Sequence, residues 1–170
     1  REAFPIKNIS YQEAMELSHF GAKVLYPPTI QPVLEKEIPI CIKNTFDVLA
    51  EGTLISKVSS NRDPIKGISH IENMSLLTLE GSGMVGIPGF SMRLFEALSA
   101  KRINVSLITQ ASSEHSICIA INDSDAENAK LAIDKAFTHE IQQHRLDPLI
   151  IENNNAIIAL VGDNMKNHQG

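Results

Sequence analysis

The segment at 81–89, GSGMVGIPG, is the part of this chain whose residue types best suit binding a small anion. Glycines let backbone N–H groups approach a ligand closely, and a helix that begins directly after the loop adds unpaired donors and a positive dipole end. A carboxylate would fit there. No Gly-Lys-Ser/Thr follows, and no parallel βαβ unit surrounds the loop, so nucleotide-binding loops are not indicated. The plainer alternative is a flexible connection between a strand and a helix.

A second group of polar residues lies shortly downstream, in the strand-like run INVSLITQ at 103–110. The period of two in a strand places Asn104, Ser106 and Gln110 on one face. Gln110 can both donate and accept hydrogen bonds, which suits the charged groups or the hydroxyl of an amino acid. For Ser106 a solvated sheet face is the simpler interpretation.

Catalytic and metal chemistry are not favoured by the remaining reactive residues. The six histidines are scattered, with no HxxxH or HExxH spacing, and nothing resembles a nucleophile elbow. Cys41 and Cys118 lie in apolar runs without paired spacing, which predicts buried thiols rather than a metal site or a disulfide scaffold. We therefore expect a ligand sensor, with no metal site, rather than an enzyme complete in itself.

Composition limits the partners and the location. The chain has 170 residues, 43% of them hydrophobic, and a net charge of −5. This acidic balance gives no broad basic surface for nucleic acid or an anionic membrane. No apolar run approaches the roughly 20 residues that span a bilayer, and the start REAF is unlike a signal peptide. These features predict a cytoplasmic protein without nucleic-acid or membrane partners.

The first third of the chain has the pattern of an α/β domain edge. Ser10 followed by Glu13 is a capping-box spacing that predicts a helix over about 11–20, with Gly21 as its C-terminal cap. A short helix is expected from about Thr29 through PVLEKE, then strands at IPICIKN and GTLIS.

The following elements place the candidate ligand residues on a small sheet with two helices. KGISHIEN and MSLLTLEG predict two strands, FSMRLFEALSAKR a helix, and INVSLITQ and HSICIAIN two more strands. SDAENAKLAIDKAF, with Ser124 and Glu127 in capping-box spacing, predicts a second helix before a last strand, LDPLIIEN. This β-α-β-β-α-β order predicts a ferredoxin-like α+β unit. The run AIIALVG predicts a further strand, which must pair elsewhere.

Long ordered runs resemble aspartokinases: SYQEAMELSHFGAKVLYPPTI at 10–30, the GTLIS and IKGIS runs, INVSLITQASSEHSI at 103–117, and AIIALVGDNM. The resemblance covers essentially the whole chain and is closest to bifunctional aspartokinase-homoserine dehydrogenases. It implies the C-terminal edge of an amino-acid kinase domain at 1–64, a first ACT regulatory unit at 65–153, and the start of a second ACT unit at 154–170.

The same resemblance implies that the parent protein uses ATP with magnesium to phosphorylate the aspartate β-carboxylate, with a homoserine dehydrogenase as a possible further activity. It places Lys23 of the GAKVL motif at the nucleotide site. Tyr26 stands where the family usually has histidine, which changes any polar contact made there. Most catalytic groups of the family lie in segments not found here, so this chain by itself is expected to be inert and to hold no cofactor.

For the effector site, the resemblance implies a pocket formed by the loop, the helix start and the next strand, often across a homodimer interface between ACT units. The corresponding residues are Met84, Gly89, Phe90, Ser91, Asn104, Val105, Ser106 and Gln110. Lysine-controlled members tend to hold an acidic residue at the position of Ser106. A neutral serine with Gln110 favours threonine, and Glu114 keeps lysine open as the alternative effector.

The resulting hypothesis is feedback control, in which the effector favours an arrangement of the parent that misplaces the kinase edge. Residues 65–71 are expected to carry the movement. Two rivals remain: an ACT module that only assembles and binds no ligand, and a complete small enzyme.

Overall fold

The computed structural model describes residues 4–23, 25–58, 63–85, 89–110, 115–163 and 165, and it divides the chain into two units. Residues 1–71 with 157–170 form the first unit, and residues 72–156 form the second. The long strands β4 and β7 have residues in both units.

The first unit has a three-stranded sheet and two helices. Strand β3 (Thr53–Ser56) is central, parallel to β1 (Asn8–Ser10) and antiparallel to β2 (Ile40–Ile42). Helix α1 is Tyr11–His19, followed by the 3-10 turn η1 (Pro27–Thr29) and the short helix α2 (Gln31–Glu35). This unit has a small core, whose buried members are Ile9, Tyr11, Ala14, Ile30 and Ile55.

The capping box predicted at the start of α1 is present. The Ser10 side chain accepts from the Glu13 N–H at 3.1 Å, and the Glu13 carboxylate accepts from the Ser10 N–H at 2.9 Å. The second acceptor of Glu13 is used as well, because Oε1 accepts the N–H of Asp163 at 3.0 Å. This carboxylate is fully buried and joins residues 150 positions apart in the sequence.

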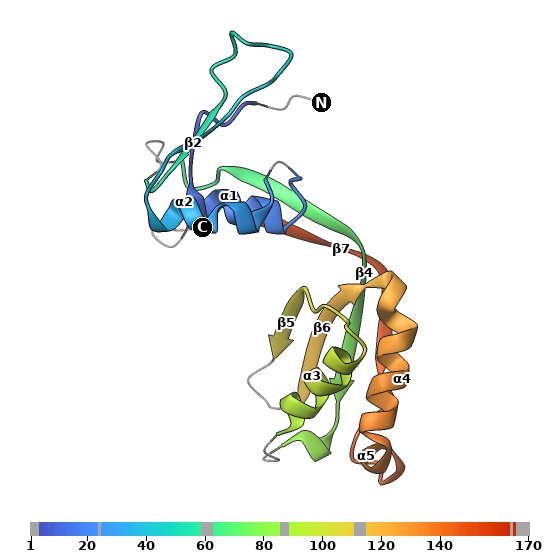
Figure 1. Ribbon diagram of the computed structural model, residues 1–170. Coiled ribbons are helices and arrows are strands. Elements are labelled where there is room, and N and C mark those ends of the chain that lie inside the picture. The colour runs from blue at the N-terminus through green and yellow to red at the C-terminus, as the bar shows by residue number, and fades with distance from the viewer. Residues whose placement is uncertain are drawn as a thin grey trace. The chain divides into compact units, whose positions relative to one another are not determined.

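The second unit contains the four-stranded sheet, in the order β5-β6-β4-β7 (Figure 1). Its elements follow the chain as β4 (Gly67–Glu80), η2 (Ser82–Met84), α3 (Phe90–Ala100), β5 (Leu107–Gln110), β6 (Ser116–Asn122), η3 (Asp123–Asp125), α4 (Ala126–Ala136), α5 (Thr138–Gln142) and β7 (Ile150–Val161). Both β4 and β5 run antiparallel to β6. The α+β class and the β-α-β-β-α-β order predicted from the sequence are confirmed.

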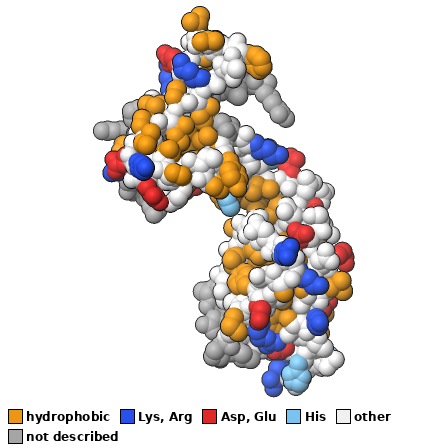
Figure 2. Space-filling view, in the orientation of Figure 1, with side chains coloured by type: hydrophobic (Ala, Val, Ile, Leu, Met, Phe, Trp, Pro, Cys, Tyr) orange, Lys and Arg blue, Asp and Glu red, His pale blue; other side chains and the backbone are white. Residues whose placement is uncertain are grey.

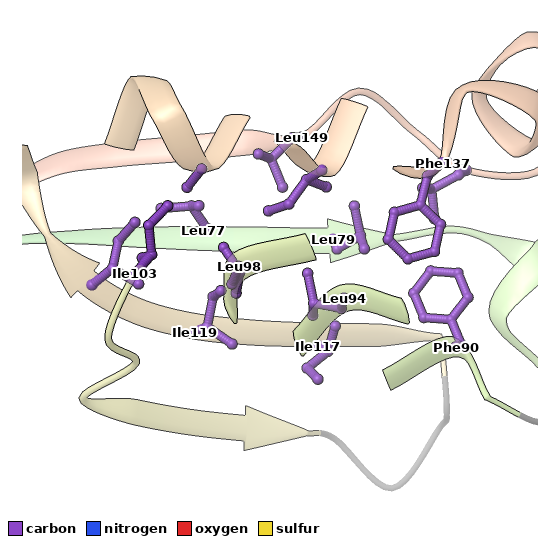
Figure 3. Packing of buried hydrophobic residues seen from close by; sticks show 14 of the residues in the cluster. Leu77, Leu79, Phe90, Leu94, Leu98, Ile103, Ile117, Ile119, Phe137 and Leu149 are labelled. Carbon is purple, nitrogen blue, oxygen red and sulfur yellow. The ribbon is translucent and has the colours of Figure 1, made fainter. Parts of the chain in front are cut away.

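Helices α3 and α4 pack on one face of the sheet. The pairing places Leu77 beside Ile119 and Leu79 beside Ile117, and all four residues lie in one buried cluster. Leu94 and Leu98 of α3 belong to the same cluster, as Figure 3 shows. Ile133 of α4 belongs to it as well. Burying a side chain of this size contributes roughly 1.5–3 kcal/mol, so this shared layer dominates the stability of the unit.

Several details differ from the sequence-based expectations. The two predicted runs at 66–81 form the single strand β4, and those at 146–162 form the single strand β7 from Ile150. Asn73 and Asn154 have φ of 59° and 63° within these strands, and asparagine tolerates this conformation better than most residues, so neither asparagine ends its strand. The boundaries at 64/65 and 153/154 stay predictions.

The prediction of a capping box at Ser124 and Glu127 was wrong. Helix α4 begins at Ala126 after a 3-10 turn, and no side chain caps it. The nearby Asp123 carboxylate accepts hydrogen bonds from Ser75 Oγ and the Asn154 N–H instead, at 2.5 and 3.2 Å, so it ties β4 and β7 to the end of β6. The expectation of two buried thiols was also wrong, because Cys41 is exposed and Cys118 is half-buried.

Candidate functional site

The loop between β4 and α3 is fixed by close backbone packing at its first glycines. The Gly83 N–H donates to the Arg145 carbonyl at 2.7 Å. A Cβ added at Gly81 or Gly83 would lie 2.4 or 2.8 Å from that same oxygen. These two glycines therefore allow contact with the chain at Arg145, whereas the sequence had suggested room for a ligand. Residues 86–88 of the loop lie outside the described residues.

The last glycine of the loop leaves the start of α3 open. Gly89 is exposed at a φ of 86°, and a Cβ there would meet only the tip of Met92, at 3.9 Å. No side chain caps the helix, and the first backbone bond of α3 runs from the Arg93 N–H to the Gly89 carbonyl at 3.0 Å. The N–H groups of the first three helical residues thus have no intrahelical acceptor, which makes this end suited to a carboxylate.

The side chains at this end divide into core and surface. Met84 and Phe90 are each only 6% exposed and belong to the buried cluster. The Phe90 ring stacks on Phe137 with centroids 4.5 Å apart, and Figure 3 shows the two rings facing each other at one end of the core. Ser91 is half-buried. Within this unit, Met84 and Phe90 can offer a ligand their backbone rather than their side chains.

The polar residues after α3 lie along the sheet edge. Strand β5 is shorter than predicted, so Asn104 and Val105 precede it, exposed and half-buried respectively. The half-buried Ser106 extends the ladder by one bond, from its N–H to the Ala120 carbonyl at 2.8 Å. The predicted alternation from Asn104 to Gln110 therefore has strand geometry only over its second half.

Pairing register places Gln110 on the helix-covered side of the sheet. Its partner in β6 is Ile117, whose partner in β4 is Leu79, and both of these face the core. Glu80, the last residue of β4, lies one step further along, just before the loop that leads to α3. Gln110 and the open start of α3 therefore belong to the same end and the same face of the unit. Glu114, the alternative acidic group, lies outside the described residues.

An ion pair that the sequence analysis missed anchors the first turn of α3. Arg93 Nη1 and Nη2 donate to the two carboxylate oxygens of Glu140 at 2.5 and 3.1 Å, and Nη2 donates to the Ala136 carbonyl at 2.6 Å. The guanidinium also lies 4.6 Å from the centre of the Phe137 ring. No sequence spacing predicts a contact between residues 47 positions apart. The only signal in the sequence was that Arg93 lies beside the apolar stripe of its helix.

Electrostatics at this pair follow from its geometry. The hydrogen bond from Arg93 holds the pKa of the Glu140 carboxyl below its ordinary value, while partial desolvation opposes that shift. Glu140 raises the pKa of Arg93 in return. The Glu140 side chain is 17% exposed, so the pair is better shielded from solvent than the Lys7–Glu51 and Lys57–Glu37 pairs, whose side chains are at least 59% exposed.

Lys23 and Tyr26 lie in the first unit, in the turns after α1. Lys23 is exposed, and the Tyr26 side chain is 70% exposed. The Tyr26 carbonyl accepts from the N–H and the Oγ1 of Thr29, at 2.9 and 2.7 Å. One exposed lysine supplies a cation but no cradle for phosphates. The nucleotide assignment of Lys23 stays a prediction.

The chain is similar to ACT domains and to aspartokinases. A family model described as ACT domain matches residues 77–137. The chain is 42% identical over 166 residues to the bifunctional aspartokinase/homoserine dehydrogenase of Haemophilus influenzae, covering 97% of this chain and 20% of the relative. The chain thus spans about a fifth of the length of the curated relatives that it matches first.

Solved structures show the same relation. The aspartate kinase of Clostridium acetobutylicum, described as an allosteric enzyme, superposes with a TM-score of 0.84 at 29% identity, over 100% of this chain and 39% of that one. E. coli aspartokinase III, solved with lysine and aspartate in its T-state, gives 0.71 at 28% identity, over 93% and 34%. Within the described residues, no helix is long and apolar enough to cross a membrane.

Proposed function

The chain carries an ACT domain and is a homologue of the aspartokinase regulatory region, and from that premise we propose that it is the feedback sensor of an aspartate kinase. The parent would transfer phosphate from ATP, with magnesium, to the β-carboxylate of aspartate. The sensor would bind an end product of the pathway, threonine in preference to lysine. Cytoplasmic location and a homodimer through the ACT units are part of the same proposal.

The observation that carries the proposal is the open start of α3 at the same end and face as Gln110. Three backbone N–H groups without intrahelical acceptors suit the carboxylate of an amino acid. An exposed amide at the end of β5 can then contact the remaining polar groups of the ligand. The lysine-bound relative supports an amino acid as the class of effector.

Threonine is preferred on the chemistry of two residues. Ser106 is neutral and half-buried, so it offers no charge to the ammonium at the end of a lysine side chain. Gln110 can donate to or accept from a hydroxyl, and a site built to hydrogen-bond a hydroxyl discriminates against ligands that lack one. Lysine stays the alternative effector.

A route for coupling exists within the first unit, where α1 is tied to the long strands at both ends. At its start, Glu13 accepts the N–H of Asp163, just after β7. At its end, Ser69 Oγ of β4 donates to the Phe20 carbonyl at 2.5 Å. A Cβ on Gly21 would lie 2.2 Å from the His70 carbonyl oxygen, so the backbone at this corner packs closely against β4. We infer that β4, which continues into the ACT sheet, carries the change toward Lys23.

Phosphoryl transfer itself is not assigned to this chain. Such transfer depends on several charges placed around the phosphates, and among the described residues we assign only Lys23 to the nucleotide. We expect the 170 residues alone to be inactive as a kinase. Turnover of ATP with aspartate by the purified chain would show instead that it is a complete small enzyme.

The proposal is tested in the full-length protein by its response to L-threonine and L-lysine. We expect threonine to inhibit aspartate kinase activity, and Ser106→Asp to raise the threonine concentration needed by about tenfold while improving the response to lysine. Ser99→Asp, which adds the same charge at the exposed far end of α3, should change neither response. Inhibition by lysine alone would favour the alternative effector, and no response to either would favour a module that only assembles.

A further inference from the structure

We propose that Arg93 positions the effector-binding turn of α3 by fastening it to the corner between α4 and α5. This inference rests on the proposed effector site. It assigns the Arg93–Glu140 pair a role in ligand affinity, beyond the stability that any ion pair contributes. We call these three groups, Arg93, Glu140 and the Ala136 carbonyl, the α3 clasp.

The start of α3 depends on outside support because its own sequence supplies little. Gly89 has no side chain that could cap the helix. Glycine also loses more backbone conformational entropy than any other residue when it is ordered. The turn that must present its N–H groups to a carboxylate would therefore fray unless something else holds it.

The clasp supplies that support from the first full turn. Arg93 is the residue whose N–H makes the first backbone bond of the helix, to Gly89. Its guanidinium makes three hydrogen bonds in a planar fork, two to the Glu140 carboxylate and one to the Ala136 carbonyl. A fork of this kind fixes orientation as well as distance, which a lysine ammonium does not.

The partner side of the clasp is rigid. Ala136 is the last residue of α4, where carbonyls lack intrahelical partners and a cation is favoured by the helix dipole. Between α4 and α5, Phe137 is fully buried, stacks on Phe90 and lies under the guanidinium. The Glu140 carbonyl accepts the N–H of Arg145 at 2.9 Å, and the Arg145 carbonyl holds the loop at Gly83.

These contacts form one connected frame around the ligand turn. The loop before α3 is held by the Arg145 carbonyl. At the start of the helix Phe90 stacks on Phe137, and in the first turn Arg93 binds Glu140. All three anchors lie in or beside α5, outside the strands and the loop that contribute ligand contacts. Pre-organisation of this kind raises affinity, because binding then costs less ordering of the site.

The experiment is a calorimetric titration of the chain with L-threonine, and with L-lysine in parallel, for the wild type, Arg93→Met, Arg93→Lys, Glu140→Gln and the double variant Arg93→Lys/Glu140→Gln. We expect Arg93→Met to weaken binding by about tenfold and Arg93→Lys by about threefold. The double variant should bind the amino acid no more weakly than whichever single variant binds it more weakly, because both changes break the same interaction. Lys130→Met, which removes the cation of an i,i+4 pair within α4, is the matched control and should leave affinity unchanged.

Melting temperatures of the ligand-free variants separate positioning from stability alone. Lower melting temperatures with dissociation constants within twofold of the wild type would overturn the inference. The same holds if the effects of the two single changes add in the double variant. If Arg93→Met does not fold, Arg93→Lys and Glu140→Gln decide the question by the same criteria. Absence of saturable heat with either amino acid in the wild type would instead contradict the proposed function.

Discussion

The two units of this chain differ in how completely each covers its own apolar side chains. In residues 72–156, strands β4 and β6 and helices α3 and α4 enclose a continuous layer in which Leu77, Ile119 and Phe137 are almost fully buried. In the first unit the buried cluster is small, while Phe4, Phe46 and Leu49 are 84%, 98% and 96% exposed. Figure 2 shows hydrophobic side chains gathered on the surface of this unit.

This contrast indicates different tasks. A unit that closes its own core can hold a ligand turn in place with its own residues, as the α3 clasp does. A unit that exposes large apolar side chains is suited to lie against further protein, because contiguous exposed apolar surface marks contact sites.

The largest expected effect compares the same substitution in both units. Phe137→Ala should lower the free energy of unfolding by about 4 kcal/mol, because it leaves a cavity beneath Phe90 and Arg93. Phe46→Ala should change it by no more than about 0.5 kcal/mol, because that ring is exposed. Urea unfolding followed by circular dichroism measures both. Equal effects would contradict the contrast between the units.

A second prediction concerns the polar contact that supplements the small core of the first unit. Glu13→Gln should cost about 2 kcal/mol, because the amide can accept from only one of the two N–H donors and turns its own NH2 toward the other. Glu51→Gln is the control, since that carboxylate pairs with Lys7 at the surface. Urea unfolding of both variants provides the measurement. If the two changes cost the same, α1 does not depend on the buried carboxylate.

The smallest expected effect is the acid sensitivity of the clasp. The pKa of Glu140 is lowered in the folded state, so its stabilisation is complete above the ordinary carboxyl pKa and is lost as pH falls through the folded value. We expect Glu140→Gln to remove about 1 kcal/mol at neutral pH, after allowance for partial exposure, and to reduce the loss of stability below about pH 4.5. Thermal unfolding at a series of pH values checks this. A parallel pH profile in wild type and variant would exclude Glu140 as the group responsible.

Local signals in the sequence predicted much of this fold. The apolar stripe of α3 and the capping box of α1 each depend on residues within one or two turns, and both are confirmed. The order of strands and helices in the ACT unit followed from such segments together. The runs that meet at Asn73, and those on either side of Asn154, were predicted as separate strands, yet each pair forms one strand with its asparagine at positive φ.

Long-range contacts could not be predicted in this way. The Glu13–Asp163 and Arg93–Glu140 contacts join residues 150 and 47 positions apart, and each depends on how whole elements pack. The side chains of Met84 and Phe90 were assigned to the site by resemblance, yet packing places them in the core. Gln110 was singled out from its residue type and by resemblance, and strand register places it on the helix-covered face at the end of the sheet where α3 begins.

Calorimetric titration of the wild-type chain with L-threonine tests whether this protein senses an amino acid. We expect saturable heat with a stoichiometry of one threonine per chain and weaker binding of L-lysine. We also expect Gln110→Ala to weaken the binding of threonine more than that of lysine. Absence of heat and of any rise in melting temperature with both amino acids would contradict the assignment of residues 72–156 as an amino-acid sensor.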